Sequence, residues 1–168
     1  SKMNMVVIFI LMNFFIGMTE ELLVRGVILS VLLTKWGKNK KGIYVSVIVS
    51  SIIFGAAHLG NHIGSADFLL ATLSQVAYAT LICVFFAACV LRSRSIWPAI
   101  IIHAAIDFVS QLQQIAVNGS VQVAGQATAP LTLLQAFQPV AIYAMLASYG
   151  FFILKKVTPD AVKSRFDN

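Results

Sequence analysis

Six ionisable side chains lie within segments of the sequence that are otherwise apolar enough to cross a membrane. They are Glu20, Glu21, Arg25, His58, His103 and Asp107. A charged side chain at the bilayer centre costs at least ~2.5 kcal/mol, so we expect these groups to converge on one cavity inside a helix bundle. A carboxylate held there can act as a general base, and an imidazole can hold a water molecule or donate to an oxyanion. No Ser or Cys stands out as a nucleophile, so the set predicts hydrolysis by an activated water molecule.

The spacing of these residues separates the two adjacent glutamates. Glu21 and Arg25 are four residues apart, so they share one face of a helix and can form an ion pair. Glu20 is offset from Glu21 by about 100° and is left free of that pair. Two further pairs stand four residues apart, namely Phe54 with His58 and His103 with Asp107. The first helix therefore carries one paired and one unpaired carboxylate.

A metal site is the alternative use of the same residues. One Glu and two His form a known zinc ligand set with an open position, and Glu20, His58 and His103 would be the ligands here. The HExxH arrangement is absent, and these three ligands would come from three different helices. Cys83 and Cys89 are six residues apart in an apolar run, which favours packing over a disulfide or a metal. We therefore expect no metal cofactor, with zinc as the alternative.

Composition places the chain in a lipid bilayer. Of the 168 residues, 59% are hydrophobic and 11% are charged, and the mean hydropathy is +0.88, whereas soluble domains have roughly 25% charged residues. We expect an all-α, polytopic transmembrane helix bundle that forms a single domain over residues 1–156, followed by a short cytoplasmic tail, 157–168. Five segments are long enough to cross the bilayer: 3–34, 43–60, 66–91, 96–116 and 131–154. The first segment is over-long, so it is tilted, kinked near Gly17 or projecting beyond the bilayer.

The positive charges indicate the orientation of these spans. Lysine and arginine gather in residues 35–42, in residues 92–95 and after residue 154, whereas the loops 61–65 and 117–130 have none. With five spans, all the basic segments fall on one side of the membrane. The positive-inside rule then places the N-terminus outside and the C-terminus in the cytoplasm, with 117–130 as an external loop. The net charge of +6 is thus a topology signal, and no nucleic-acid partner is expected.

Three short motifs on the first, second and fourth spans resemble one known family. They are EELLVR (Glu20 to Arg25), FGAAH (Phe54 to His58) and HAAID (His103 to Asp107), the last preceded by SIWPAIII. Their order and spacing resemble the CPBP family over about residues 10–115. This family contains the type II CAAX-prenyl proteases, the bacterial bacteriocin-processing and immunity proteins and the Abi proteins.

The resemblance implies an intramembrane endopeptidase and gives each residue a role. Glu20 would be the general base, assisted by His58, and His103 would contribute to the same water and oxyanion region. The supporting residues would be Glu21, Arg25 and Phe54. Asp107 stands where the family has Asn or Asp; an ionised Asp cannot donate to an oxyanion, so it would be protonated or would orient His103. Members of the family are described both as metalloproteases and as metal-free glutamate proteases, and for this chain we favour a metal-free glutamate protease.

Several alternatives stay open at the level of the sequence. A single buried histidine or Glu–Arg pair is also consistent with a role in helix packing. The residues alone favour neither a hydrolase nor a transporter or proton pathway. A non-catalytic immunity or regulatory protein of the same family is a further alternative. We expect a peptide or membrane-protein substrate with a CAAX-like C-terminus or a leader peptide, and a bacterial plasma membrane. Few residues precede the first motif, which suggests a fragment, a homo-oligomer or a partner membrane protein that completes the cavity.

Overall fold

The computed structural model describes residues 2–62, 69–118 and 132–164. Within these ranges the chain is helical with short turns and contains no strand, which confirms the all-α prediction. The elements are α1 (Lys2–Glu21), the π-helix η1 (Leu22–Leu29), α2 (Ser30–Trp36), α3 (Lys40–Ala57), the 3-10 helix η2 (His58–His62), α4 (Leu69–Ser93), α5 (Trp97–Asn118), α6 (Leu133–Leu154) and α7 (Pro159–Lys163). The predicted external loop, 117–130, lies almost entirely outside the described residues.

Four helical stretches of the described chain are long and apolar enough to cross a membrane. They are Val6–Trp36, Lys40–Gly60, Leu69–Ser93 and Leu133–Leu154. The fourth predicted span, 96–116, corresponds to α5, whose apolar stretch Trp97–Leu112 is shorter than the other four stretches. The predicted polytopic bundle is therefore confirmed, with α5 as its shortest apolar member.

The over-long first span is one continuous helix with a change of pitch in its middle. Of the three alternatives for this span, a break of the helix near Gly17 is not seen, because α1 runs through Gly17 to Glu21. The irregularity follows directly after Glu21, where eight residues adopt the wider π-helical turn. The side chain of Ser30 donates to the carbonyl of Arg25, five residues earlier, at 3.0 Å. Single π-turns within α-helices occur frequently at functional sites, and here the π-helix begins next to the two glutamates.

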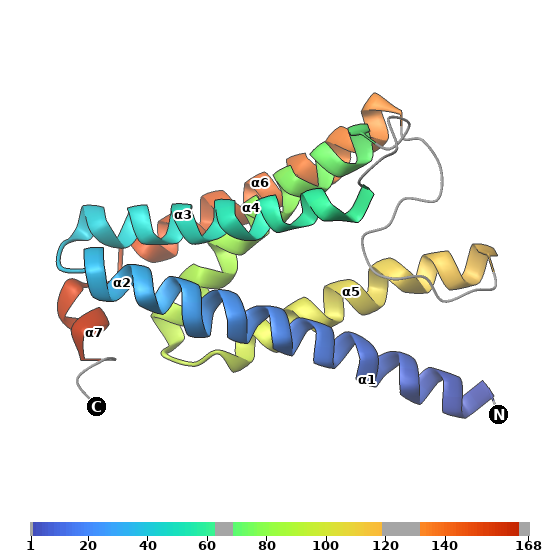
Figure 1. The fold of residues 1–168 in the computed structure, drawn as a ribbon, viewed down its shortest axis with the longest axis horizontal. Helices are drawn as coiled ribbons and strands as arrows, with labels where there is room; N and C mark the ends of the chain where they lie inside the picture. The colour runs from blue at the N-terminus through green and yellow to red at the C-terminus, as the bar shows by residue number, and fades with distance from the viewer. Residues whose placement is uncertain (1, 63–68, 119–131, 165–168) are drawn as a thin grey trace.

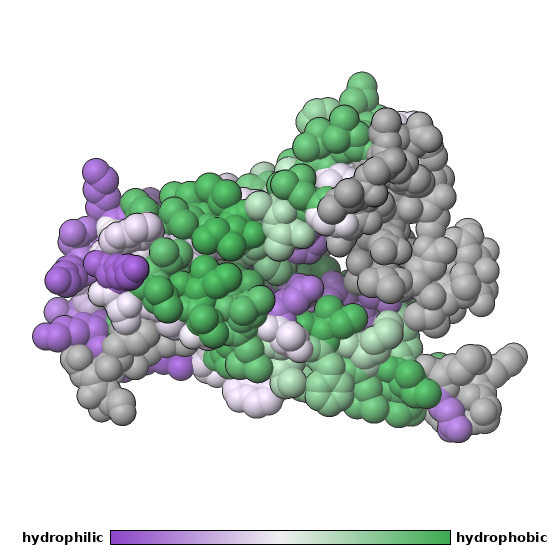
Figure 2. Space-filling model, viewed as in Figure 1, coloured by the Kyte–Doolittle hydropathy of each residue, from purple (hydrophilic) through white to green (hydrophobic). Residues whose placement is uncertain are grey.

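The helices form two groups that meet at one end of the molecule (Figure 1). Helix α1 packs along α5 in one group, and α3, α4 and α6 pack side by side in the other. The π-helix η1 contacts α3 and α4, and α4 also contacts α5, so these elements join the two groups. The groups diverge toward the end where α1 begins (Figure 1). Hydrophilic residues are visible between their apolar surfaces (Figure 2).

Glycines allow the helices of each group to approach closely. A Cβ atom on Gly17 would lie 3.1 Å from the backbone nitrogen of Ala104 in α5. On Gly150 in α6 it would lie 2.9 Å from the Cα atom of Phe85 in α4, and on Gly55 in α3 it would collide with Thr80 in α4. Association of membrane helices depends on such close packing, because lipid chains are as apolar as leucine.

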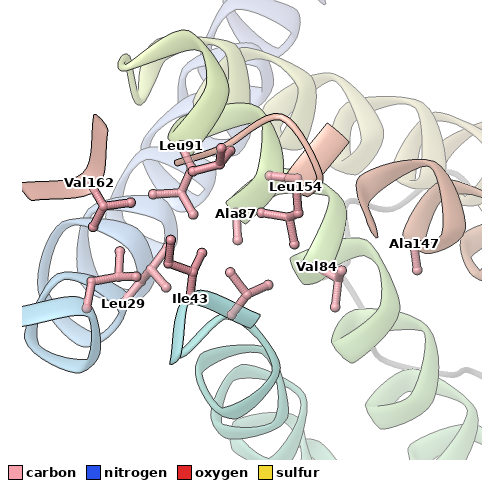
Figure 3. Packing of buried hydrophobic residues seen from close by; sticks show 12 residues of the cluster. Leu29, Ile43, Val84, Ala87, Leu91, Ala147, Leu154 and Val162 are labelled. Atoms are coloured by element: carbon pink, nitrogen blue, oxygen red, sulfur yellow. The ribbon is translucent and has the colours of Figure 1, made fainter. Parts of the chain in front are cut away.

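A cluster of buried apolar side chains closes the end where the two groups meet (Figure 3). Leu29 of η1, Ile43 of α3, Ala87 of α4 and Leu154 of α6 are at most 1% exposed and belong to this cluster. Val162 of α7 completes it from outside the spans. Two smaller buried clusters include Phe54 and Phe86, the aromatic residues of the candidate site.

The basic segments all lie at this closed end of the molecule. The α2–α3 turn, the α4–α5 turn and the residues after α6 meet there, whereas α1 begins at the opposite end (Figure 1). The side chain of Lys40 donates to the carbonyl of Lys155 at 2.7 Å and also to the carbonyl of Val157, which ties α3 to the segment after α6. Figure 2 shows the hydrophilic cap at this end and the apolar surface beside it. The side of the membrane that this cap faces stays a prediction.

Candidate active site

The predicted ion pair between Glu21 and Arg25 lies at the centre of the bundle. Their side chains are fully buried, and Nη1 of Arg25 donates to Oε1 of Glu21 at 2.9 Å. The guanidinium carbon of Arg25 lies 5.5 Å from the ring centre of Phe54 in α3 and 5.4 Å from that of Phe86 in α4. Nη2 of Arg25 also donates to the carbonyl of Cys83 at 3.3 Å. The pair therefore joins η1 to α3 and α4 through charge, π-electron and backbone contacts.

His103 of α5 connects this pair to the unpaired glutamate. Its Nδ1 atom donates to Oε1 of Glu21 at 2.8 Å. Its Nε2 atom lies 3.4 Å from Oε2 of Glu20 and 3.7 Å from Oδ2 of Asp107. The ring stacks on Phe86 with centroids 5.4 Å apart. One imidazole thus lies among three carboxylates with only 8% of its residue surface exposed.

The two adjacent glutamates differ in exposure, as their spacing predicts. Glu21 is fully buried, whereas 36% of the Glu20 side chain is exposed. Glu20 lies near the end of α1, next to the π-helix, and its exposed carboxylate can be reached from outside the bundle. Of the two, only Glu20 offers a carboxylate oxygen to an incoming molecule.

His58 stands at the point where α3 changes into the 3-10 helix η2. Its Nδ1 atom donates to the carbonyl of Phe54 at 3.0 Å, because a carbonyl oxygen can only accept. This bond places a proton on Nδ1, so Nε2 is the acceptor when the ring is neutral. The ring meets Phe54 edge-on at 4.9 Å. Within the described residues no ion pair joins His58 to an acidic side chain, although Asp107 lies within electrostatic range of it.

The structure therefore brings together residues from the first, second and fourth predicted spans. Glu20, Glu21, His103 and Asp107 make direct contacts, and Phe54 connects His58 to His103, whose ring lies 6.1 Å from that of Phe54. The contributions of the third predicted span, α4, were missed, and they are Phe86, the Cys83 carbonyl and Tyr78. The ring centres of Tyr78 and Tyr143 of α6 lie 5.5 Å apart, and both phenols are within electrostatic range of Asp107. A tyrosine inside an apolar span was the available signal, because its hydroxyl needs a polar neighbour.

The three suggested metal ligands do not cluster in the described structure. No group of three or more His, Cys, Asp or Glu side chains in the described ranges is placed to hold a metal ion. Of the suggested ligands Glu20, His58 and His103, only Glu20 and His103 are in contact. The Nδ1 contacts of His103 with Glu21 and of His58 with a backbone carbonyl are also usual for zinc-bound histidines, so they do not decide the question. The three side chains are not gathered around one point in the described part of the chain, and no step below is derived through a metal.

Comparison with known proteins gives one match. The family model described as type II CAAX prenyl endopeptidase Rce1-like matches residues 2–109. This range runs from the start of α1 to just beyond Asp107, so it contains all three motifs and the contacts among Glu20, Glu21, Arg25, His103 and Asp107. Searches of curated proteins and of solved structures found no match. The matched region covers well over half of the chain, which therefore belongs to the Rce1-like family of type II CAAX prenyl endopeptidases.

Proposed function

We propose that this protein is an intramembrane endopeptidase in which Glu20 activates the water molecule that attacks the peptide. Membership of the family supports membrane endopeptidase activity in general. One observation carries the specific proposal. The partly exposed Glu20 stands beside an imidazole that is anchored through Nδ1 to the buried Glu21–Arg25 pair. A general base needs to be accessible and held by rigid neighbours, and Glu20 meets both conditions.

In the proposed reaction the Glu20 carboxylate accepts a proton from water, and the resulting hydroxide adds to the carbonyl carbon of the scissile bond. The carbonyl oxygen becomes an oxyanion, which the imidazolium form of His103 stabilises by charge. Collapse of the intermediate breaks the C–N bond, and Glu20 returns its proton to the leaving amine. The reaction consumes one water molecule and regenerates the carboxylate.

The other residues position these groups. The neutral His58 ring can accept a hydrogen bond at Nε2 from the second O–H group of the attacking water molecule. Asp107 lies 3.7 Å from Nε2 of His103, which supports an orienting role rather than donation to the oxyanion. Glu21 and Arg25 fix the imidazole from the other side. Catalysis would then need no metal, since the side chains supply the base, the acid and the charge.

The proposed substrates are peptides whose scissile bond lies close to a membrane anchor. The site is enclosed by helices that expose many apolar side chains, so a substrate held in the lipid can approach the partly exposed Glu20. A C-terminus of the CAAX type, as in the family's description, and a leader peptide are the two substrate classes that we propose. The proposed location is a bacterial plasma membrane.

The test compares the wild type with Glu20→Gln after reconstitution into liposomes. Two fluorescence-quenched peptides serve as probes, one with a farnesylated CAAX terminus and one with an apolar leader segment. We expect wild-type cleavage of one probe, and a loss of about 10²- to 10⁴-fold in Glu20→Gln, because a general base contributes that much. Asp160→Asn removes a carboxylate at the closed end and should leave cleavage unchanged.

Three outcomes decide the proposal. Wild-type rates in Glu20→Gln would refute Glu20 as the base. Cleavage of neither probe by the wild type would refute both substrate classes. A rate that falls with a chelator and returns with zinc would refute the metal-free mechanism. Thermal unfolding of each variant checks that the bundle is intact.

A further inference from the structure

A groove of about 380 Å³ lies at the closed end of the bundle, away from the candidate active site. It is bounded by the ends of α4 and α6 and by the start of α5. Its apolar lining includes Cys89, Tyr149, Phe152 and Ile153. The rings of Tyr149 and Phe152 stack with centroids 6.2 Å apart, and both residues are more than half exposed. The groove therefore presents an aromatic surface that nothing in the described chain covers.

Two cations stand at the rim of this groove. Arg92 precedes the last residue of α4, and Lys156 follows the last residue of α6 by two positions. The apolar spans end at these residues, so we expect both side chains at the depth of the lipid headgroups. The amine of Lys156 lies 5.7 Å from the ring centre of Phe152, which holds the charge over the groove. No acidic side chain lines the groove within the described residues.

A second groove at the same end lacks this combination of two unopposed cations and an aromatic wall. It measures about 370 Å³, lies between α2 and α7 and also carries two lysines, Lys38 and Lys163. Asp160 lines it as well, so one of its positive charges is offset, and its walls contain no aromatic ring. The two grooves have similar volumes, lie at the same end of the bundle and carry two cations each. They differ in net charge and in aromatic surface.

We propose that the groove between α4, α5 and α6 binds an anionic phospholipid. The phosphate lies between Arg92 and Lys156, and an acyl chain covers Tyr149 and Phe152. Charge complementarity selects the anionic headgroup, as in other basic pockets between helices at a membrane surface. Since Pro98 of α5 also lines the groove, the lipid ties the start of the helix that carries His103 to α4 and α6. This inference rests on the chain lying in a membrane and does not depend on peptidase activity.

The test counts retained lipids by native mass spectrometry of the purified full chain in mixed micelles. The probes are phosphatidylglycerol and phosphatidylcholine at equal concentration. Each basic side chain near an anionic headgroup contributes about 5-fold to binding. We therefore expect a wild-type preference for phosphatidylglycerol that falls by about 25-fold in the double variant Arg92→Gln/Lys156→Gln. The matched double variant Lys38→Gln/Lys163→Gln loses the same formal charge at the same end and should keep the preference.

A variant that leaves both cations in place tests the apolar part of the site. Cys89→Trp fills the groove, so we expect it to lose the retained lipid although Arg92 and Lys156 are unchanged. Bound lipid also stabilises the folded state by mass action, so phosphatidylglycerol should raise the unfolding temperature of the wild type but not of Cys89→Trp. Equal losses in the two double variants would show general surface attraction and overturn the proposal. So would a wild type that binds both lipids equally, a result that needs no variant.

Discussion

The Nδ1 atom of His103 lies 2.8 Å from Oε1 of Glu21, the same oxygen that accepts a hydrogen bond from Arg25. A carboxylate paired with arginine accepts hydrogen bonds, so Nδ1 of His103 carries a proton. The Nε2 atom then faces the carboxylates of Glu20 and Asp107. If Nε2 of His103 carried no proton, its lone pair would point at two anions. If Nε2 is protonated, its N–H group faces two acceptors. The geometry therefore favours one proton shared among His103, Glu20 and Asp107.

The buried pair of Glu21 and Arg25 supplies the first prediction. Glu21→Leu leaves a fully buried guanidinium without its counter-ion, so we expect a loss of about 3–5 kcal/mol in the free energy of unfolding. The double variant Glu21→Leu/Arg25→Met removes both charges and should lose less than Glu21→Leu alone. Reversible unfolding in mixed micelles measures all three proteins. A double variant less stable than Glu21→Leu would contradict the prediction.

Asp107 supplies the second prediction. Asp107 lies 3.7 Å from Nε2 of His103, which is an ion-pair distance. If this contact shortens to a hydrogen bond in the reacting enzyme, the amide oxygen of Asp107→Asn can still accept, though a neutral bond is about half as strong as a charged one. We expect Asp107→Asn to lower kcat by about 10-fold or less, and Asp107→Leu, which has no acceptor, by about 10²-fold or more. The measurement is kcat on whichever probe peptide the wild type cleaves. Equal losses in the two variants would show that the negative charge itself is needed.

The sequence predicted the ionisable part of the site because its rules are local. The i, i+4 spacing of Glu21 and Arg25 predicted their pair. The cost of lone charges in lipid predicted that Glu20 and His103 would meet. These expectations needed no knowledge of how the helices cross, and the structure contains both contacts.

The parts that the sequence did not predict depend on packing between helices. Phe86 is one of several aromatic residues in an apolar run, so only the crossing of α4 shows that it stacks on His103. The π-helix after Glu21 has no residue signature, because a wider turn is stabilised by tertiary contacts that the sequence of LLVRGVIL does not reveal. The spacing placed His58 one turn after Phe54, but it did not show that the His58 ring donates to the Phe54 carbonyl.

Phe86 supplies the third prediction. Its ring is 1% exposed and contacts both the Arg25 guanidinium and the His103 imidazole. Phe86→Leu removes both contacts and leaves space, so we expect a loss of about 1–3 kcal/mol in unfolding free energy. The neighbouring Phe85 is partly exposed and contacts neither group, which makes Phe85→Leu the matched control with a smaller loss. Thermal unfolding compares the two, and equal losses would show that ring size alone matters.

The glycines at the helix crossings supply the last prediction. In Gly150→Ala the new Cβ would lie 2.9 Å from the Cα atom and 3.2 Å from the nitrogen of Phe85, and backbone atoms cannot rotate away. The crossing of α4 and α6 must therefore widen, which we expect to cost about 1–3 kcal/mol. Gly26→Ala is the matched control, because a Cβ on Gly26 meets no heavy atom within 4 Å. That variant should change the unfolding free energy by less than about 1 kcal/mol, since only helix propensity differs. If the two alanine variants unfold at the same temperature, close backbone approach does not set the α4–α6 contact.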